Sequence, residues 1–415
     1  MIKHNIIYTA SSNWRFDIKS AEGSYITLSD GQTVIDFTSG YNIANLGWNN
    51  KELLEAADVQ LKKNTAVTMW STDQAQWEYA EAFMQVLPKS LRAVGRAIGG
   101  MESIEEAVKT ARAYTGKKNI IGFQEMYHGQ SLTAIALTYP EAYMLPKAVQ
   151  PSKDGFIRME YPKKGIADEG AHYQLFLEKL ENLLKAGDVA GVLTEPGMIT
   201  GWGSTDILPD MFSKDIRMLT EKYKTLLIFD EVGTGFSRTG TLFGMNRIDV
   251  IPDIAVFAKG MSNGVLPIGA MVTTTEIADA TWNKTQLQSS FGWNPVSCAV
   301  AHKVLEIHTR DMVWEKAKIR GAGLLDSLKK SLSGVQQIST IDGIGMEIGI
   351  QFTATPKMGE TLYAIRDLAM KNGAHIICNG ATTIQIMPPL TTDEKILDEG
   401  AEILVAAIKE ECGKL

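Results

Sequence analysis

The segment 225–270 constrains the fold of this chain most strongly, because it holds two uninterrupted apolar runs that each end at a charged residue. Leu226–Phe229 runs into Asp230, and Ile254–Ala258 runs into Lys259. Apolar runs of this length are typical of interior strands in a parallel sheet that is covered on both faces. In open α/β sheets, ligands bind beyond the carboxyl ends of such strands. We therefore expect Asp230 and Lys259 to face one crevice.

Strand-like runs alternate with helical patterns through the middle of the chain. A helix is expected over Glu102–Tyr114, where apolar residues recur on one face. Further strands are expected at Ala93–Ile98, Asn119–Phe123, Ala190–Thr194 and Gly269–Thr273. Regular alternation of this kind predicts an α/β fold with a doubly wound, mainly parallel sheet.

The two ends of the chain show a different pattern. Ser24–Leu28 and Thr33–Phe37 flank the dipeptide Asp30-Gly31, which predicts a β-hairpin. In the C-terminal third, helices are expected at Pro295–His308, Val313–Leu332, Leu362–Lys371 and Asp393–Glu411, and strands at Gly343–Phe352 and Ile384–Met387. This mixture predicts a second, smaller α+β domain.

Length and charge bound the class of protein. The 415 residues are enough for two domains, and the net charge of −7 argues against nucleic acid as a partner, because phosphate-binding surfaces need a basic excess. The N-terminus lacks the apolar core of a signal peptide, and no apolar run approaches the ~20 residues of a membrane span. We therefore expect a cytoplasmic protein that does not act at a membrane.

The cysteines and histidines show no metal-binding spacing. Cys298, Cys378 and Cys412 are far apart and form no CxxC pair, and the six histidines include no HxH or HxxxH pair. A disulfide framework is not expected, which fits a reducing compartment. We also expect no metal site built from protein side chains.

The chemistry of Lys259 depends on its neighbours. A lysine at a strand end with its amine in water is the common case. Here, however, Gly260, Ser262, Asn263 and Gly264 follow, and such small residues let a flat ligand approach the backbone. A lysine that is partly removed from water there would have a lowered pKa, which suits covalent chemistry with an aldehyde.

Asp230 allows two interpretations. An apolar strand that ends in Asp-Glu also occurs in ATPases, where the aspartate serves magnesium and a GxxxxGK[ST] loop lies upstream. The only upstream Gly-Lys pair is Gly116-Lys117, which is followed by Lys118 and lacks the earlier glycine, so the ATPase interpretation fails. An acid and a lysine in one crevice instead match pyridoxal phosphate enzymes, where a carboxylate holds the ring nitrogen and a lysine holds the aldehyde.

Two further motifs suit the same cofactor. The Gly-Gly-Met-Glu segment at 99–102 lies between a strand and a helix, and free N–H groups at a helix N-terminus suit a phosphate. The Tyr-His-Gly segment at 127–129 follows the next strand, and its tyrosine could stack on a flat ring. Taken alone, each motif is more commonly an ordinary turn or a packed aromatic side chain.

Taken together and in this order, the motifs resemble those of the class III (omega-type) aminotransferases, which are pyridoxal 5'-phosphate enzymes of fold type I. The resemblance covers nearly the whole chain and rests on the runs Asp230–Gly240, Ala258–Gly264, Pro267–Ala270, Glu195-Pro196, Phe291–Pro295 and Pro388–Leu390. It implies a large cofactor-binding domain over 46–300 with a mainly parallel seven-stranded sheet. It also implies a small α+β domain built from 1–45 and 301–415, and a homodimer with shared active sites.

The resemblance further implies roles for particular residues. Lys259 and Asp230 are the expected catalytic residues, the first binding the cofactor aldehyde and the second holding the ring nitrogen. The expected cofactor-binding positions are Gly100, Met101, Tyr127, His128, Glu195, Asp230, Val232, Lys259 and Ser290. Of these, Tyr127 and Val232 would enclose the ring, and Ser290 would reach the phosphate bound in the other subunit.

Departures from the family pattern bear on the phosphate and on the substrate. Met101 stands where a phosphate-binding hydroxyl is usual, so backbone groups must contribute more. Members that take α-amino acids or 2-oxoglutarate often carry an arginine at the position of Gln385 and a glutamate at the position of Thr200. Both halves of this pair are absent, and losing only the glutamate would leave an unpaired buried charge. The uncharged substrate pocket, with Tyr41 and Gln385, favours an amine or ω-amino substrate.

We therefore expect an aminotransferase that moves an amino group from an amine or ω-amino compound to a keto acid or aldehyde with ping-pong kinetics. Two alternatives stay open at this point. Racemases, aminomutases and lyases use the same scaffold and cofactor without transamination. A binding or regulatory protein would keep the fold without the chemistry, and the presence of both Asp230 and Lys259 argues against it.

Overall fold

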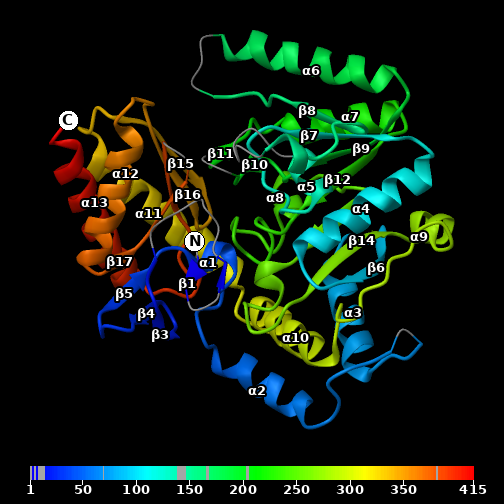
Figure 1. The fold of residues 1–415 in the computed structure, drawn as a ribbon, viewed down its shortest axis with the longest axis horizontal. Helices are drawn as coiled ribbons and strands as arrows, with labels where there is room; N and C mark the ends of the chain where they lie inside the picture. Colours follow the sequence, from blue (N-terminus) through cyan, green and yellow to red (C-terminus); the bar gives the residue numbers. More distant parts are fainter. Residues whose placement is uncertain are drawn as a thin grey trace.

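A computed structural model describes residues 2–3, 6–7, 15–68, 70–137, 146–164, 168–201, 205–379 and 382–415. Figure 1 shows two halves of unequal size, of which the larger is built around a wide sheet. The smaller half contains the C-terminal helices α11 (Val313–Leu332), α12 (Met358–Lys371) and α13 (Glu394–Cys412). The strands β3 (Ile18–Glu22), β4 (Tyr25–Leu28) and β5 (Thr33–Asp36) lie against this smaller half, although they come from the opposite end of the sequence (Figure 1).

The wide sheet has seven strands. In spatial order they are β6 (Leu91–Ala97), β14 (Gly269–Thr274), β13 (Ile254–Phe257), β12 (Leu226–Asp230), β9 (Val189–Thr194), β7 (Asn119–Phe123) and β8 (Phe156–Met159). Strand β14 pairs antiparallel with both of its neighbours, whereas every other pairing in the sheet is parallel. The predicted α/β fold with a mainly parallel seven-stranded sheet is confirmed.

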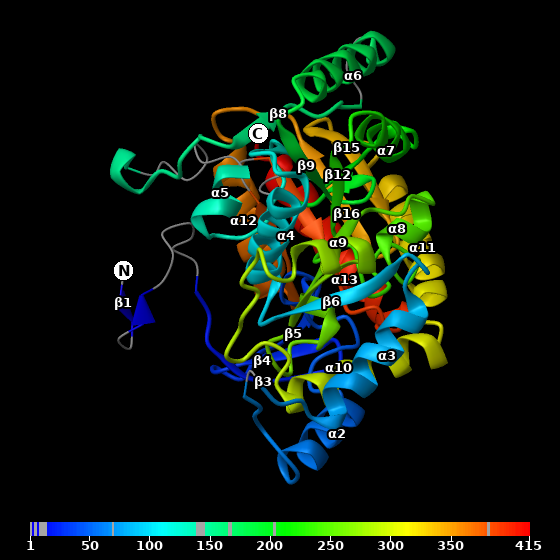
Figure 2. The same cartoon turned by 90° about the vertical axis from the view of Figure 1, so that its right-hand side faces the viewer.

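Helices cover both faces of this sheet, which explains the uninterrupted apolar runs. Leu226 and Ile228 of β12 pack on one face, and the alternate residues Leu227 and Phe229 pack on the other. The first face is covered by α4 (Gly100–Thr115), α5 (Leu132–Leu137) and α9 (Thr275–Thr281). The second face is covered by α3 (Gln74–Val86), α6 (Glu169–Lys185), α7 (Phe212–Lys222) and α8 (Gly244–Ile248). Figure 2 shows these layers from the side.

The two ends of the chain share one small sheet. Its strands, in spatial order, are β17 (Ala374–His375), β5 (Thr33–Asp36), β4 (Tyr25–Leu28) and β3 (Ile18–Glu22). The predicted hairpin around Asp30-Gly31 is confirmed, since β4 and β5 pair antiparallel on either side of it. Strand β17 then joins β5 in parallel, with Ala374 opposite Ile35. This pairing supports our proposal that 1–45 and 301–415 form a small domain beside a large domain over 46–300.

The second small sheet corrects one prediction. Its strands, in spatial order, are β15 (Ile338–Ile344), β16 (Glu347–Phe352), β19 (Thr383–Ile386) and β18 (Ile377–Asn379). The single strand predicted over Gly343–Phe352 is therefore wrong, because the chain turns back at Gly345, which has a φ of +55°. A Cβ on Gly345 would lie only 2.3 Å from the carbonyl oxygen of Arg238. The tight packing of the turn on Arg238 requires glycine, and no local pattern reveals that contact.

The remaining helices and strands complete the fold. They are β1 (Ile2–Lys3), β2 (Ile6–Ile7), α1 (Ser39–Asn42), α2 (Lys51–Leu61), η2 (Lys147–Val149), β10 (Met198–Ile199), β11 (Asp206–Ile207), η3 (Lys259–Met261) and α10 (Pro295–Arg310). None of the helices in the described part of the chain combines the length and the apolar character that crossing a bilayer requires.

Candidate active site

Asp230 and Lys259 meet at one edge of the wide sheet. Asp230 is the last residue of β12 and lies opposite Val256 of the parallel strand β13. Lys259 follows the end of β13 and opens the short helix η3. Because parallel strands end at the same edge, both side chains line the same cavity, as the sequence predicted.

The carboxylate of Asp230 is buried and held on both oxygens. The side chain is 3% exposed. Its Oδ1 accepts the backbone N–H of Val232 at 2.9 Å, and its Oδ2 lies 2.7 Å from Nδ1 of His128. The other ring nitrogen of His128, Nε2, is buried and has no hydrogen-bond partner among the described residues. His128 thus fixes the orientation of Asp230 rather than facing solvent.

The surroundings of Lys259 disfavour the protonated, charged form of its amine. Burial lowers the pKa of Lys259, whereas the carboxyl groups of Asp230, Glu195 and Glu347 act in the opposite direction. A lowered pKa leaves more of the amine neutral near pH 7, and the neutral amine is the nucleophilic form.

The small residues after Lys259 serve packing as well as ligand access. Ser262 and Gly264 line the cavity, as expected. Gly260 instead faces the protein interior, where an added Cβ would lie 2.7 Å from Nδ2 of Asn45. Close packing therefore explains the glycine at 260. The predicted approach of a flat ligand to the backbone applies only to Ser262 and Gly264.

Helix α4 points its N-terminus at the same cavity. Its N-cap residue is Gly99, which has no side chain to cap the first turn, and Gly99, Gly100 and Met101 all line the cavity wall. The first N–H groups of a helix have no partner within the helix and favour an anion. A Cβ on Gly100 would lie 3.1 Å from Cγ2 of Val232, so glycine lets the helix end approach that side chain closely.

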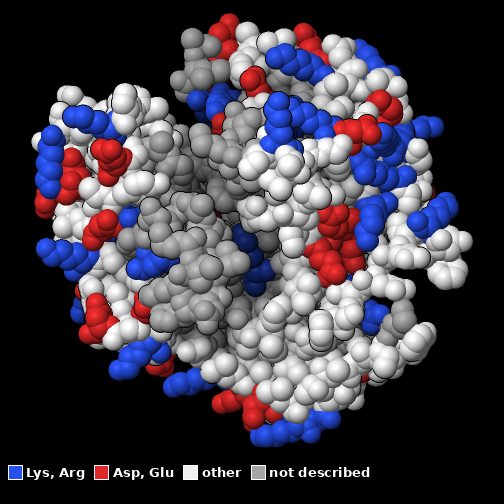
Figure 3. All heavy atoms as spheres, viewed as in Figure 1, with Lys and Arg blue, Asp and Glu red and all other residues white. Residues whose placement is uncertain are grey.

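Most of the predicted residues lie together around this cavity of about 620 Å³. Those on its wall are Gly100, Met101, Tyr127, His128, Glu195, Asp230, Val232 and Lys259. Several other wall residues were not among the predicted site residues, and these include Ile43, Ile98, Gln130, Leu266 and Ile268. Figure 3 shows the surface hollowed between the two halves of the molecule, with basic side chains visible inside the hollow.

Glu195 is tied to Thr200. Thr200 donates its backbone N–H to Oε2 of Glu195 at 2.7 Å and its hydroxyl to Oε1. Glu195 is 3% exposed. Burial, followed by the charge of Asp230, raises the pKa of Glu195 to about 8, although the Thr200 hydrogen bonds and Lys259 oppose that shift. Glu195 thus binds a proton far more readily than an ordinary carboxylate.

Three predicted residues lie away from the cavity wall. Ser290 lines a separate hollow of about 1210 Å³ that also touches Trp70 and Arg96. Gln385 is 1% exposed and donates its amide to the hydroxyl of Thr205 at 2.8 Å. Tyr41 is 46% exposed. Burial of the Tyr41 hydroxyl, with smaller contributions from Cys378 and Tyr127, raises its pKa to about 12, although the residue as a whole is half exposed.

A buried acid near Lys259 was missed. Glu347 of β16 has no exposed surface, and its carboxylate acts on the pKa of Lys259. It accepts a hydrogen bond from Nδ2 of Asn42 at 2.7 Å. The sequence held one sign of this buried acid, because Glu347 is the only acidic residue inside the apolar run Ile344–Ile350. Carboxylates are rarely buried without a partner, so an acid in such a run points to a buried polar contact.

Comparison with known proteins identifies the family. The sequence profile described as "Aminotransferase class-III" matches residues 7–408, so the chain belongs to the class III aminotransferases. The chain is therefore an enzyme that transfers amino groups, in agreement with the paired acid and lysine at the sheet edge.

Individual relatives cover almost all of the chain. Acetylornithine aminotransferases from Methanothermobacter thermautotrophicus and Listeria monocytogenes are 28% and 29% identical over 95% and 99% of it, and the matches span 94% and 98% of those proteins. An (S)-enantioselective omega-transaminase from Thermomicrobium roseum is 28% identical, with a TM-score of 0.89 over 96% of this chain and 93% of its own. A transaminase from the marine bacterium Virgibacillus is 26% identical, with a TM-score of 0.89 over 98% and 97%.

The cavity residues fit the cofactor of this family. Class III aminotransferases are pyridoxal phosphate enzymes. A pyridine nitrogen needs a carboxylate as its partner, and the Asp230 carboxylate is held in place by His128 and Val232. An aldehyde needs an amine with a lowered pKa, and Lys259 provides it. A phosphate needs N–H donors, which the N-terminus of α4 offers at the wall of the same cavity.

Proposed function

We propose that this aminotransferase binds pyridoxal 5'-phosphate in the cavity beside β12, β13 and α4. One observation carries the proposal, namely that Asp230 and Lys259 lie at the ends of adjacent parallel strands and line one cavity. Lys259 would bind the aldehyde, and Asp230 would hold the ring nitrogen. Tyr127 and Val232 would enclose the ring, while the backbone of Gly100 and Met101 would hold the phosphate.

The chain's own groups supply proton transfer and electrostatics. When bound, the cofactor supplies a ring that takes up the electron pair left on the substrate carbon. The Asp230 carboxylate keeps a proton at the ring nitrogen, and His128 keeps Asp230 in position for this task. The Nζ of Lys259 would take the proton from the substrate carbon as general base and deliver it to the aldehyde carbon of the cofactor as general acid, which its lowered pKa favours.

The proposed donor is an amine or an ω-amino compound, and the proposed acceptor is a keto acid or an aldehyde. In the family, the positions of Gln385 and Thr200 often hold charged residues, but here both side chains are uncharged. The Gln385 amide donates to Thr205, and Thr200 donates to Glu195. Without a cation at these two positions, the site recognises an α-carboxylate poorly, because such a group needs a paired cation when it leaves water. We expect ping-pong kinetics, in which the first product leaves before the second substrate binds.

The proposed assembly is a homodimer in the cytoplasm. Ser290 lies in a hollow separate from the cavity of its own chain, which suits a residue that serves the site of a second copy. The three cysteines, Cys298, Cys378 and Cys412, are all free, as is usual in a reducing compartment.

A single-turnover experiment tests the proposed reaction. The purified protein, saturated with pyridoxal phosphate, is mixed with a primary amine in the absence of any acceptor. Transamination predicts one equivalent of carbonyl product per active site, followed by full turnover when pyruvate is added. An amine that is isomerised or cleaved without this half-reaction would favour a racemase, aminomutase or lyase. Glutamate, tested in parallel as a donor, is expected to react poorly, and rapid reaction with glutamate would refute the uncharged-pocket argument.

A further inference from the structure

The segment α1 is a left-handed turn rather than a helix. Four consecutive residues have positive φ angles, which are +44° at Ser39, +61° at Gly40, +65° at Tyr41 and +64° at Asn42. Residues other than glycine rarely adopt this backbone region, and they do so only where the surrounding structure enforces it. Such enforced turns are concentrated at ligand sites. The turn lies between the two halves of the molecule (Figure 1).

The turn buries its two ends and presents the tyrosine between them. Ser39 and Asn42 are 0% and 3% exposed, whereas Tyr41 is 46% exposed. The residue that follows the turn, Ile43, lines the cofactor cavity. Tyr41 is therefore the partly exposed residue of the turn, next to the cavity residue Ile43, while both ends of the turn are anchored inside the protein.

Two buried charges anchor these ends. Arg238 donates from Nη2 to the hydroxyl of Ser39 at 3.0 Å, and that hydroxyl donates to the carbonyl of Met387. Glu347 accepts the amide of Asn42 at 2.7 Å. Arg238 and Glu347 are both without exposed surface. Each helps the other to keep its charge, because Arg238 opposes the effect of burial on the pKa of Glu347, and Glu347 opposes the effect of burial on that of Arg238.

Glu347 does not touch the substrate itself. Neither Glu347 nor Asn42 lines the cavity, and Oε1 of Glu347 and Oδ1 of Asn42 are buried without a partner in the described structure. The Asn42 amide, however, also lies 3.5 Å from the carbonyl oxygen of Gly233, which does line the cavity. Glu347 therefore has two routes to the reaction, one through its charge acting on Lys259 and one through Asn42 and the turn that contains Tyr41, and the Asn42→Gly variant affects only the second.

We propose that Glu347 is a positioning residue that fixes the Tyr41 turn and thereby sets which amines the enzyme accepts. This inference rests on the proposed function and on the role of Tyr41 in the substrate pocket that the family resemblance implies. A loosened turn lets Tyr41 move relative to the site, and small displacements of this kind alter binding of a bulky substrate far more than that of a small one.

The test compares a small amine, isopropylamine, with a bulky amine, 1-phenylethylamine, with pyruvate as the acceptor. The variants are Glu347→Gln, which keeps the shape but removes the charge, and Asn42→Gly, which suits a positive φ but removes the amide. Each is expected to change the ratio of kcat/KM for the two amines by about tenfold, mainly through KM. The absorption band of the bound cofactor should stay as in the wild type. Glu106→Gln, which alters another buried acid with an unpartnered oxygen, is the matched control and should leave the ratio unchanged.

A double-mutant cycle distinguishes positioning from general damage. If Glu347 acts through Tyr41, the effect of Glu347→Gln on the ratio disappears in a Tyr41→Ala background. An effect of the same size in both backgrounds would overturn the inference. If Glu347→Gln does not fold, Asn42→Gly carries the same cycle. A wild type that transaminates amines, with unchanged ratios in both variants, refutes the inference alone, whereas a wild type that transaminates none refutes the proposed function.

Discussion

Asp230 and Glu231 are neighbours in the sequence, but they act on different parts of the molecule. Asp230 turns toward the cavity and pairs with His128. Glu231 turns away and accepts hydrogen bonds from the backbone of Gly244 at 2.9 Å and of Met245 at 2.7 Å, which caps the N-terminus of α8. At the residue scale, one acid therefore serves chemistry and the adjacent acid serves stability.

Isosteric variants of the two acids should separate these contributions. Asp230→Asn is expected to lower kcat/KM by about 10²–10³-fold, the range typical for loss of one electrostatic contact to a reacting group, with little change in melting temperature. Glu231→Gln replaces one of the two accepting oxygens by a donor that faces one of these N–H groups, and should lower the free energy of unfolding by about 1–3 kcal/mol while retaining most activity. Steady-state kinetics and thermal melting measure both. The reverse assignment of the two effects would contradict the geometry.

His308 predicts a loss of stability in acid. It is fully buried, and its Nδ1 lies 2.7 Å from the hydroxyl of Ser237. Burial, with a smaller effect of Arg238, lowers the pKa of His308 from 6.5 to about 3. The unfolded chain therefore binds the proton more readily, so the stability that the neutral ring contributes is present above pH 6.5 and is lost as the pH falls toward 3, by at most about 1.4 kcal/mol per pH unit.

Denaturant titrations at several pH values check this effect. His308→Gln should flatten the decline in unfolding free energy between pH 6.5 and 3, even if the variant is less stable at pH 7. His302→Gln, which changes a half-buried histidine on the same helix, is the control and should follow the wild type. An unchanged slope in His308→Gln would mean that other groups govern acid unfolding.

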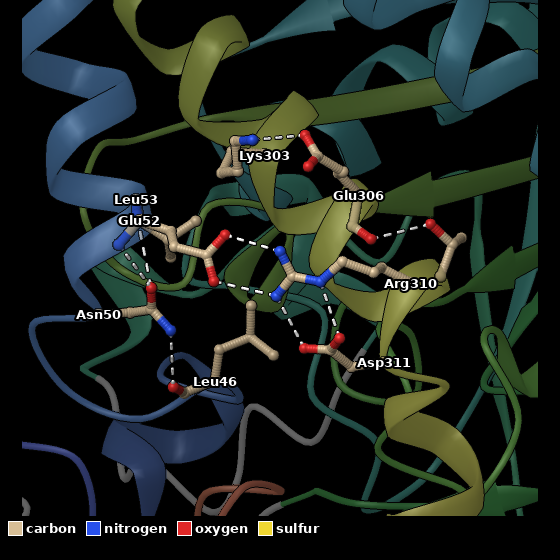
Figure 4. Close-up of polar contacts among 9 residues, drawn as sticks. Leu46, Asn50, Glu52, Leu53, Lys303, Glu306, Arg310 and Asp311 are labelled. Carbon is tan, nitrogen blue, oxygen red and sulfur yellow. Dashed lines mark hydrogen bonds and ion pairs between the residues drawn. The ribbon is translucent and has the colours of Figure 1, made fainter.

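At the scale of elements, an ion pair joins α10 to the capped N-terminus of α2 (Figure 4). Oδ1 of Asn50 accepts the backbone N–H groups of Glu52 at 3.1 Å and Leu53 at 3.4 Å, which caps α2. At the end of α10, Arg310 contacts both carboxylate oxygens of Glu52, at 2.8 and 3.0 Å. The ion pair is nearly half exposed on both sides, so solvent weakens it.

We expect the cap to matter more than the ion pair. Asn50→Ala should lower the free energy of unfolding by about 1 kcal/mol, because two N–H groups lose their acceptor. Arg310→Ala should change it by less than about 1 kcal/mol. Asn50→Asp, which can still cap the helix, should remain close to the wild type. A larger loss in Arg310→Ala than in Asn50→Ala, measured by denaturant titration, would contradict this ranking.

Local pattern was sufficient for elements that bury a regular face. Strand β7 and helix α11 have the predicted bounds. The turn at Gly345 was missed because its cause is a contact with Arg238, more than a hundred residues earlier in the chain. The site divides in the same way. Asp230 and Lys259 could be predicted because parallel strands end at one edge, whereas Glu347 reaches the Tyr41 turn only through the packing of β16 on the N-terminal segment.

At the scale of the whole molecule, the proposed dimer makes each active site depend on two chains. Ser290 lies outside the cavity that contains Lys259 of its own chain. If Ser290 serves the partner's site, a chain with Lys259→Ala still supplies an intact Ser290 to the active site of its partner. A chain with Ser290→Glu still supplies an intact Lys259 to its own active site. Pairing the two would then restore one intact site per dimer.

Co-expression with two affinity tags yields these hybrids for assay. Each variant alone should be inactive, since one lacks the amine and the other places a carboxylate beside the phosphate. The purified hybrid should recover about half of the wild-type activity, because one of its two sites is complete. A hybrid as inactive as its parents would show that Ser290 acts within its own chain, and a monomer in sedimentation would refute the shared site altogether.

The central claim is that Lys259 binds pyridoxal phosphate at the sheet edge that Asp230 shares. The most direct measurement is borohydride reduction of the purified, cofactor-saturated enzyme, followed by proteolysis and mass spectrometry. The account predicts that a near-visible absorption band disappears on reduction and that the cofactor mass is found on the peptide containing Lys259. Lys259→Ala should carry no label. A label on a different lysine, or a protein that binds no added pyridoxal phosphate, would contradict the account.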